Sequence, residues 1–164
     1  MTEPMTTTTV IRADLGEPAH AAAIVAIIEG YAADPMGGEK VLGDDVKATM
    51  IDGLRATPAA RVWLARDDRE GTFLGVVVAF VGFSTFAAKP RWNVHDVAVV
   101  PQARGKGVGR AMLTHVIEDA TAAGCTAVTL EVRHDNAPAR HLYASLGFGD
   151  GFAPMAFWER PIEG

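Results

Sequence analysis

The chain has 164 residues, of which 49% are hydrophobic, and a net charge of −5 at pH 7. This length and apolar content suffice for one core, so residues 1–164 are expected to form a single domain without metals or disulfides. The scattered basic residues argue against nucleic-acid binding, the longest apolar run (73–83) is too short to span a membrane as a helix, and the one cysteine, Cys125, fits a reducing, cytoplasmic compartment.

The order of the predicted elements indicates an α/β (α+β) fold. Residues 1–8 lack a secretory signal and are expected to be disordered. Apolar periodicity and Gly/Pro turns place the remaining elements. In chain order we expect a strand at 10–13, a helix at 18–33, a second helix capped by Asp44 or Asp45 and ended by Pro58, strands at 61–66, 72–84 and 92–100, a helix at 111–123, a strand at 127–132, a helix from Asn136 to about Leu146, and two short closing strands from Phe152 to Arg160.

These elements predict a mixed, mostly antiparallel sheet of six to seven strands with about four helices. The strands between residues 61 and 100 follow one another directly, which favours antiparallel pairing, whereas the later strand–helix–strand order favours a parallel crossover. Helices then cover both faces of the sheet. The helix at 111–123 is expected to bury Met112, Leu113, Val116, Ile117 and Ala120, with Gly124 at its C-terminal end and Cys125 as a buried small residue.

A glycine-rich segment, residues 104–110 (Arg-Gly-Lys-Gly-Val-Gly-Arg), lies between a predicted strand and a predicted helix. Glycine adopts positive φ without a Cβ penalty and lets the backbone approach a ligand closely. A helix N-terminus adds unpaired N–H donors and a partial positive charge. The segment therefore predicts a pyrophosphate-binding loop, and an ordinary strand-to-helix turn is the alternative if the loop is taken alone.

The spacing of the glycines restricts the phosphate ligand. No glycine here begins the G-x-x-x-x-G-K-[ST] pattern of a P-loop. The dinucleotide pattern G-x-G-x-x-G is also absent. The position of its third glycine is occupied by Arg110 when the pattern begins at Gly105, and by Met112 when it begins at Gly107. A third pattern, [RQ]-x-x-G-x-[GA], is satisfied twice, by Arg104-x-x-Gly107-x-Gly109 and by Gln102-x-x-Gly105-x-Gly107.

This third pattern, after a strand ending in Val-Val-Pro, resembles the acyl-coenzyme A site of the GNAT N-acetyltransferase superfamily. A second pair of motifs, Leu130-Glu131-Val132-Arg133-x-x-Asn136 and Leu142-Tyr143-x-x-x-Gly147-Phe148, is similar to the family's other half-site and lies at the family's usual separation. The resemblance covers residues 93–148, about a third of the chain. It implies the GNAT fold with a splayed central strand, and acetyl-coenzyme A as co-substrate without a metal.

The resemblance also implies which residues bind acetyl-coenzyme A. Backbone N–H groups of 105–110 would hold the pyrophosphate, with charge from Lys106 and Arg110, whose alternative role is that of a solvated helix start. The splayed strand would pair with pantetheine, and one of its N–H groups would polarise the thioester carbonyl. The assigned residues are Val97, Ala98, Val99, Arg104, Gly105, Lys106, Gly107, Val108, Gly109, Arg110, Asn136 and Tyr143.

Tyr143 is the candidate general acid. The departing thiolate needs a proton, and a tyrosine with a pKa of ~10 can supply one while staying protonated at neutral pH. Without the motif, Tyr143 would be interpreted as a core tyrosine on a short helix. Asn136 resembles the family's pantetheine-contacting asparagine, and it also fits a helix N-cap, a role compatible with the first.

The general base has three candidates, His95, Asp96 and Glu131. Deprotonating an alkyl amine of pKa ~10.4 at pH 7 costs roughly 4–5 kcal/mol, so a nearby base assists the reaction. His95 has a reference pKa of ~6.5 and, by period-two alternation, is expected to share a strand face with Val97 and Val99. Glu131 lies where ribosomal-protein N-terminal acetyltransferases carry a catalytic glutamate. A hydrogen-bonded polar pair that stabilises the splayed strand is the alternative for His95 and Asp96.

The acceptor is expected to be a primary amine of a small molecule, selected by residues 31–45 and 83–92. Acidic residues in the first segment, with Phe83, Phe86 and Trp92 in the second, could hold an ammonium group or could form a lid over the core. The polyamine branch of the family carries an acidic pair where this chain has His95 and Asp96, which argues against a polyamine. The alternatives are acetylation of a protein N-terminus or lysine, and a non-catalytic acyl-coenzyme A sensor. We expect a homodimer formed through 152–158.

Overall fold

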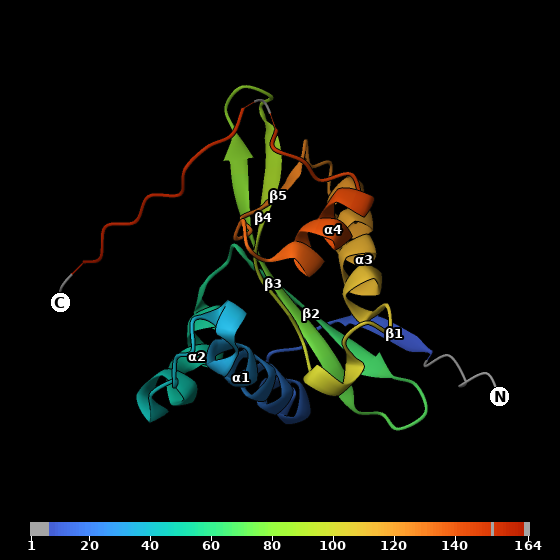
Figure 1. Cartoon of the computed structure of the whole chain (residues 1–164). Coiled ribbons are helices and arrows are strands. Elements are labelled where there is room, and N and C mark those ends of the chain that lie inside the picture. The colour runs from blue at the N-terminus through green and yellow to red at the C-terminus, as the bar shows by residue number, and fades with distance from the viewer. Residues whose placement is uncertain (1–6, 152, 163–164) are drawn as a thin grey trace. The chain divides into compact units, whose positions relative to one another are not determined.

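A mixed sheet is the centre of the first of two compact units, Met1–Leu130, in the computed structural model, which describes residues 7–151 and 153–162. Within these residues the sheet has five strands in chain order. Antiparallel pairs join the first four strands, and the fifth runs parallel to the fourth. The strands are β1 (Thr8–Arg12), β2 (Ala60–Asp67), β3 (Phe73–Ser84), β4 (Lys89–Val99) and β5 (Val128–Leu130) (Figure 1).

Helices cover both faces of this sheet, as predicted. α1 (Pro18–Ala33) and α2 (Asp44–Ala56) lie on one face, and α3 (Val108–Ala122) lies on the other (Figure 1). Two short 3₁₀ helices, η1 (Pro35–Gly37) and η2 (Pro101–Ala103), follow α1 and β4. The second unit, Glu131–Gly164, contains α4 (Ala137–Ser145).

Alternation along the central strands divides the core of the first unit into two clusters. Trp63, Val77 and Met112 belong to the cluster on the α3 face, whereas Leu64 and Val76 belong with Ile24 to the cluster on the α1 face. Each successive side chain of a strand points to the opposite face. The middle of β2 (62–65) and most of β3 are therefore apolar on both sides, which is why residues 62–65 and 73–83 are continuous apolar runs.

The predictions for the two ends of the chain need correction. Residues 153–162 form no strand, so the closing strands expected from Phe152 to Arg160 are wrong over that range, and Phe152 itself lies outside the described residues. A strand needs a backbone partner, and none is recorded for residues 153–162. The expected disorder of residues 1–8 is wrong for Thr8, which pairs with Asp67 in β1.

Two helix starts also differ from prediction. α2 has Gly43 as its N-cap, and Asp44 is already helical, where it pairs with Lys47 at 3.1 Å instead of capping the helix. α3 begins at Val108, three residues before the predicted start. The second difference changes the candidate site, because it moves the helix N-terminus into the glycine-rich segment.

Candidate functional site

The glycine-rich segment forms a tight left-handed turn that leads directly into α3. Gly105 and Gly107 have φ values of 72° and 86°, in the region that favours glycine. A Cβ at either position would meet no heavy atom within 4 Å. The backbone conformation, rather than crowding inside the protein, therefore accounts for glycine at these two positions.

The N-terminus of α3 is built without a side-chain cap. Gly107 is its N-cap and has no side chain to bond the first turn, which contains Val108, Gly109 and Arg110. The first N–H groups of a helix have no intrahelical acceptor, and the helix dipole makes this end partially positive. The turn and the helix start thus suit a phosphate group.

β4 separates from β5 next to this loop. The parallel pairing joins Trp92, Asn93 and Val94 of β4 to β5 and extends no further in the described residues. The antiparallel pairing of β4 with β3 continues to Val99. The last part of β4 is therefore paired on its β3 side alone, which is the splay that the sequence resemblance implies.

The ladder shows which backbone groups face the splay. The Val100 N–H donates to the Leu74 carbonyl at 2.9 Å, and bonded pairs recur at every second residue of an antiparallel ladder. The backbone of Ala98, opposite Val76, therefore faces β3. The N–H and C=O groups of Val97 and Val99 point away from β3, and the Val99 C=O accepts a hydrogen bond from Arg104. Of the three residues predicted to bind pantetheine through the backbone, Val97 and Val99 are therefore the two whose backbone groups face the open side.

A β-bulge in β4 brings His95 and Asp96 to the same face of the sheet. Val78 lies opposite Asp96 and Ala79 lies opposite Val94, so His95 is the extra residue. Val97 and Val99 pack in the cluster on the α3 face. The prediction that His95 shares their face is wrong, because the bulge breaks the period-two alternation on which it depended.

His95 and Asp96 both line a pocket of about 260 Å³ on the α1 and α2 side of the sheet. His95 is exposed, and its ring lies 5.1 Å from that of Phe80 in an edge-to-face arrangement. Burial raises the pKa of Asp96, and the nearby His95 opposes that rise. The remaining lining residues are apolar, namely Ile24, Ile28, Met50, Leu54, Val78 and Phe80.

Three predicted aromatic contributors lie elsewhere. Phe83 and Phe86 are exposed near the β3–β4 turn, and Trp92 is buried on the α3 face with its ring 5.5 Å from that of Trp63. The pocket instead contains Phe80, which was not predicted from the sequence. Its place in a long apolar run made it look like any other core residue.

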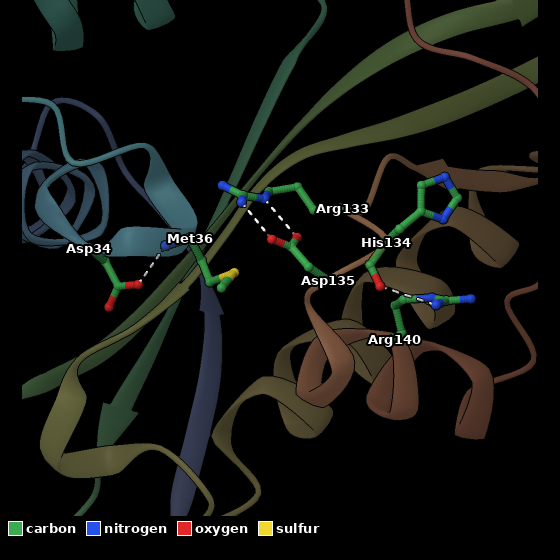
Figure 2. Close-up of polar contacts among 6 residues, drawn as sticks. All are labelled: Asp34, Met36, Arg133, His134, Asp135 and Arg140. Atoms are coloured by element: carbon green, nitrogen blue, oxygen red, sulfur yellow. Dashed lines mark hydrogen bonds and ion pairs between the residues drawn. The ribbon is translucent and has the colours of Figure 1, made fainter.

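Arg104 links the end of β4 to the segment that follows α1. Its Nε donates to the Val99 carbonyl at 3.0 Å, and its Nη1 pairs with Asp34 Oδ2 at 2.8 Å. Asp34 also accepts from the Met36 N–H (Figure 2). The Met36 hydrogen bond, followed by that from Arg104, lowers the pKa of Asp34. Asp34 is therefore held as a carboxylate between η1 and the glycine-rich segment.

The second unit contains the remaining predicted site residues, Glu131, Asn136 and Tyr143. Asn136 is the N-cap of α4, and its Oδ1 accepts from the Ala139 N–H at 3.3 Å, so its predicted capping role is confirmed. Tyr143 is half-buried on α4, with its ring 6.0 Å from that of Phe148. Glu131 is exposed directly after β5.

An ion pair orders the turn between Glu131 and Asn136. Arg133 binds the Asp135 carboxylate through both Nε and Nη2, at 2.9 and 2.7 Å, as Figure 2 shows. This hydrogen bonding lowers the pKa of Asp135. The Asn136 N–H donates to the Arg133 carbonyl at 3.1 Å, which sets the approach to the cap of α4.

The raised pKa of Asp96 predicts that its charge destabilises the fold at neutral pH. When the pKa of a carboxyl is higher in the folded than in the unfolded protein, the free energy of unfolding falls as pH rises from the unfolded to the folded pKa. Above the folded pKa the whole decrease applies. We expect Asp96→Asn to raise the melting temperature at pH 7 by about 2–4 °C, the shift that ~1 kcal/mol gives in a domain of this size. The gain should disappear near pH 3.

Thermal unfolding of both proteins across this pH range measures the effect. Asp68→Asn is the matched control, because it removes an exposed carboxylate of the same unit. A lower melting temperature for Asp96→Asn at pH 7 would show that the charged form of Asp96 stabilises the fold.

The mixed sheet with a splayed fourth strand and an uncapped helix after a glycine-rich turn defines the GNAT fold. Residues 24–148 match the Acetyltransferase (GNAT) family, and the chain belongs to this family. A solved structure of a probable acetyltransferase has a TM-score of 0.80 at 22% identity, over 95% of this chain and 99% of that chain. This likeness confirms the fold class.

Two curated relatives have named substrates. The streptothricin acetyltransferase of Streptomyces lavendulae is 33% identical over 109 residues, covering 66% of this chain and 56% of that protein. The ribosomal protein bS18-alanine N-acetyltransferase of Escherichia coli K12 is 44% identical over 58 residues, covering 35% and 39%. The chain thus matches about half or less of the length of these relatives.

The described part of the chain has neither a membrane-spanning helix nor a cluster of metal-binding side chains. Across residues 7–151 and 153–162, no helix combines the length and apolar character needed to cross a membrane. The same residues contain no group of three or more His, Cys, Asp or Glu side chains arranged to hold a metal ion.

Proposed function

We propose that the chain is an N-acetyltransferase that moves an acetyl group from acetyl-coenzyme A to a primary amine of a small molecule, by direct attack in a ternary complex in the cytoplasm. The observation that carries this proposal is the bulge in β4. It directs the His95 and Asp96 side chains into the pocket, while the backbone groups of Val97 and Val99 face the splay. Two binding regions for two substrates therefore meet along one strand.

The residues present fit coenzyme A. The turn at Gly105 and Gly107 and the start of α3 suit its pyrophosphate, with Lys106 and Arg110 as nearby positive charges. The backbone of Val97 and Val99 suits its pantetheine arm. When bound, acetyl-coenzyme A supplies an activated acetyl thioester. Asn136 is proposed to contact the pantetheine while it caps α4.

The proposed reaction needs a base for the attacking amine and an acid for the departing sulfur. A new C–N bond replaces the C–S bond of the thioester. The ammonium form of the substrate loses two protons, of which one leaves to solvent through the base and the other restores the proton that Tyr143 gives to the sulfur. His95 and Asp96 accept an amine proton, because both line the pocket and burial raises the pKa of Asp96 above its ordinary value. Tyr143 donates its phenolic proton to the departing sulfur. Glu131 remains the third candidate base.

The experiment is an assay of thiol release from acetyl-coenzyme A with amines of several classes. Amino acids, monoamines, polyamines, aminoglycosides and short peptides are offered separately, with hydrolysis in the absence of an amine as the background. Acetylation of one class at least tenfold above background is expected. Tight binding of coenzyme A without any amine-dependent thiol release would instead indicate a non-catalytic acyl-coenzyme A sensor.

A second candidate is acetylation of a protein N-terminus. The identity to the ribosomal protein bS18-alanine N-acetyltransferase favours it. In the assay above, acetylation of a peptide beginning with alanine and no reaction with free amines would select this candidate.

Homodimer formation stays a prediction. Met155, Phe157 and Trp158 are exposed, which leaves apolar surface available for a second copy of the chain. Sedimentation of the purified chain as a monomer would contradict it.

A further inference from the structure

The acceptor pocket has an almost entirely apolar wall. Of its eight lining residues, six are aliphatic, aromatic or thioether side chains from α1, α2 and β3. Ile24 and Val78 are buried, while Ile28, Met50, Leu54 and Phe80 are half-buried, so this wall forms part of the core cluster on the α1 face. A ligand in such a pocket gains affinity from hydrocarbon that it removes from water.

The polar groups lie together on one strand of the pocket. The bulge places His95 beside Asp96 in β4, and Phe80 lies against the His95 ring at 5.1 Å. Asp96 is the one carboxylate in the lining, so the pocket matches a single ammonium group of the ligand. A second ammonium group bound along the apolar wall would lose its hydration without gaining a partner there.

The carboxylates on the nearby helices are engaged elsewhere or exposed. Glu29 and Asp44 both pair with Lys47, at 2.9 and 3.1 Å. Asp34 is bound by Arg104. Glu39 and Asp45 are exposed and do not line the pocket. The acidic residues of 31–45 therefore do not supply the pocket with a second negative charge.

We propose that the acceptor is a compact apolar monoamine, an aliphatic or aryl-alkyl amine with one amino group. Its amine lies at His95 and Asp96, and its hydrocarbon part lies against Ile28, Met50 and Leu54. The pocket volume of about 260 Å³ sets the size, since it lies just below the range of roughly 300–1,000 Å³ typical of pockets for drug-sized ligands. This inference rests on the proposed acetyltransferase function and names the substrate class of the same site.

The test compares kcat/KM for isoamylamine and phenethylamine with values for spermidine, kanamycin and an alanine peptide, together with calorimetric titration of each amine. The monoamines are expected to exceed the polycations at least tenfold. Preferred acetylation of spermidine or kanamycin overturns the inference and leaves the proposed function intact. Preferred acetylation of the peptide overturns the inference and selects a protein N-terminus as the acceptor. If the monoamines bind but no thiol is released, the acetyltransferase function is overturned and the monoamine-binding site is retained. If the monoamines do not bind and no thiol is released, the function and the site are both overturned.

A charge introduced into the wall gives an independent arm of the test. Leu54→Glu adds a second carboxylate to the pocket, and the preference for phenethylamine over spermidine should fall at least tenfold. Val46→Glu is the matched control, because Val46 is exposed on the same helix and does not line the pocket. Circular dichroism verifies that each variant is folded. An unchanged preference for phenethylamine over spermidine in folded Leu54→Glu contradicts the inference. If Leu54→Glu does not fold, the comparison of amines on the unmodified chain decides the inference.

Discussion

Replacing Gly107 with glutamate is expected to weaken coenzyme A binding at least a hundredfold. Gly107 is the uncapped start of α3, so a carboxylate there reaches the N–H groups that would otherwise hold the pyrophosphate. A negative charge at a helix N-terminus stabilises the helix. The variant should therefore keep its fold while its own side chain competes with the ligand. Isothermal titration calorimetry with coenzyme A measures the loss.

The backbone strain of this substitution has a matched control. A glutamate at φ 86° carries a penalty of roughly 1–2 kcal/mol for the left-handed conformation, which lowers stability on its own. Gly71→Glu introduces the same charge at φ 70°, in the β2–β3 turn and in open space. Gly71→Glu should bind coenzyme A as the unmodified chain does. Equal affinity in Gly107→Glu and the unmodified chain would refute the pyrophosphate-binding role of the glycine turn.

The glycine turn was predictable because its features are local. Positive φ at Gly105 and Gly107 follows from glycine spacing between a strand and a helix, and no distant contact is needed to produce it. The start of α3 was misplaced for a related reason. Glycine is a weak helix former, so Gly109 favoured a later start, but the structure includes it in the first turn.

The side of β4 on which His95 lies was not predictable from the sequence. A bulge is a relation between two strands, since Val78 pairs with Asp96 while Ala79 pairs with Val94, and no residue of β4 alone signals it. One inserted residue reverses the alternation, so the strand buries Trp92 toward α3 before the bulge and Ala98 toward α1 after it. The same reversal explains why Trp92, predicted near the acceptor, lies in the other core cluster.

The apolar nature of the acceptor pocket also depends on tertiary packing. Ile24 and Leu54 have the helical spacing of ordinary core residues, and the helices that carry them are separated by 34–43 in the sequence. Only the packing of α1 and α2 against β3 and β4 turns these core residues into the wall of a pocket. The acidic residues of 31–45 favoured a charged acceptor site in the sequence, whereas six of the eight residues that line the pocket are apolar.

Tyr143→Phe is expected to lower turnover at least tenfold while coenzyme A binding changes little. The substitution keeps the ring, and with it the contact with Phe148 at 6.0 Å, so α4 should remain intact. It removes the phenolic proton that the proposed reaction transfers to the departing sulfur, and general acid catalysis typically contributes 10²–10⁴-fold. Steady-state kinetics give kcat, and calorimetry gives the affinity for coenzyme A.

Phe148→Leu separates the hydroxyl from the packing of the ring. This variant perturbs the neighbour of Tyr143 and leaves the phenol in place, so its loss of kcat should be much smaller than that of Tyr143→Phe. Equal losses in the two variants would assign the effect to packing, and an unaltered kcat in Tyr143→Phe would remove Tyr143 from the acid role. A fall in kcat confined to Tyr143→Phe, with coenzyme A affinity retained, would support the acid role, because the hydroxyl then acts in the reaction and not in the fold.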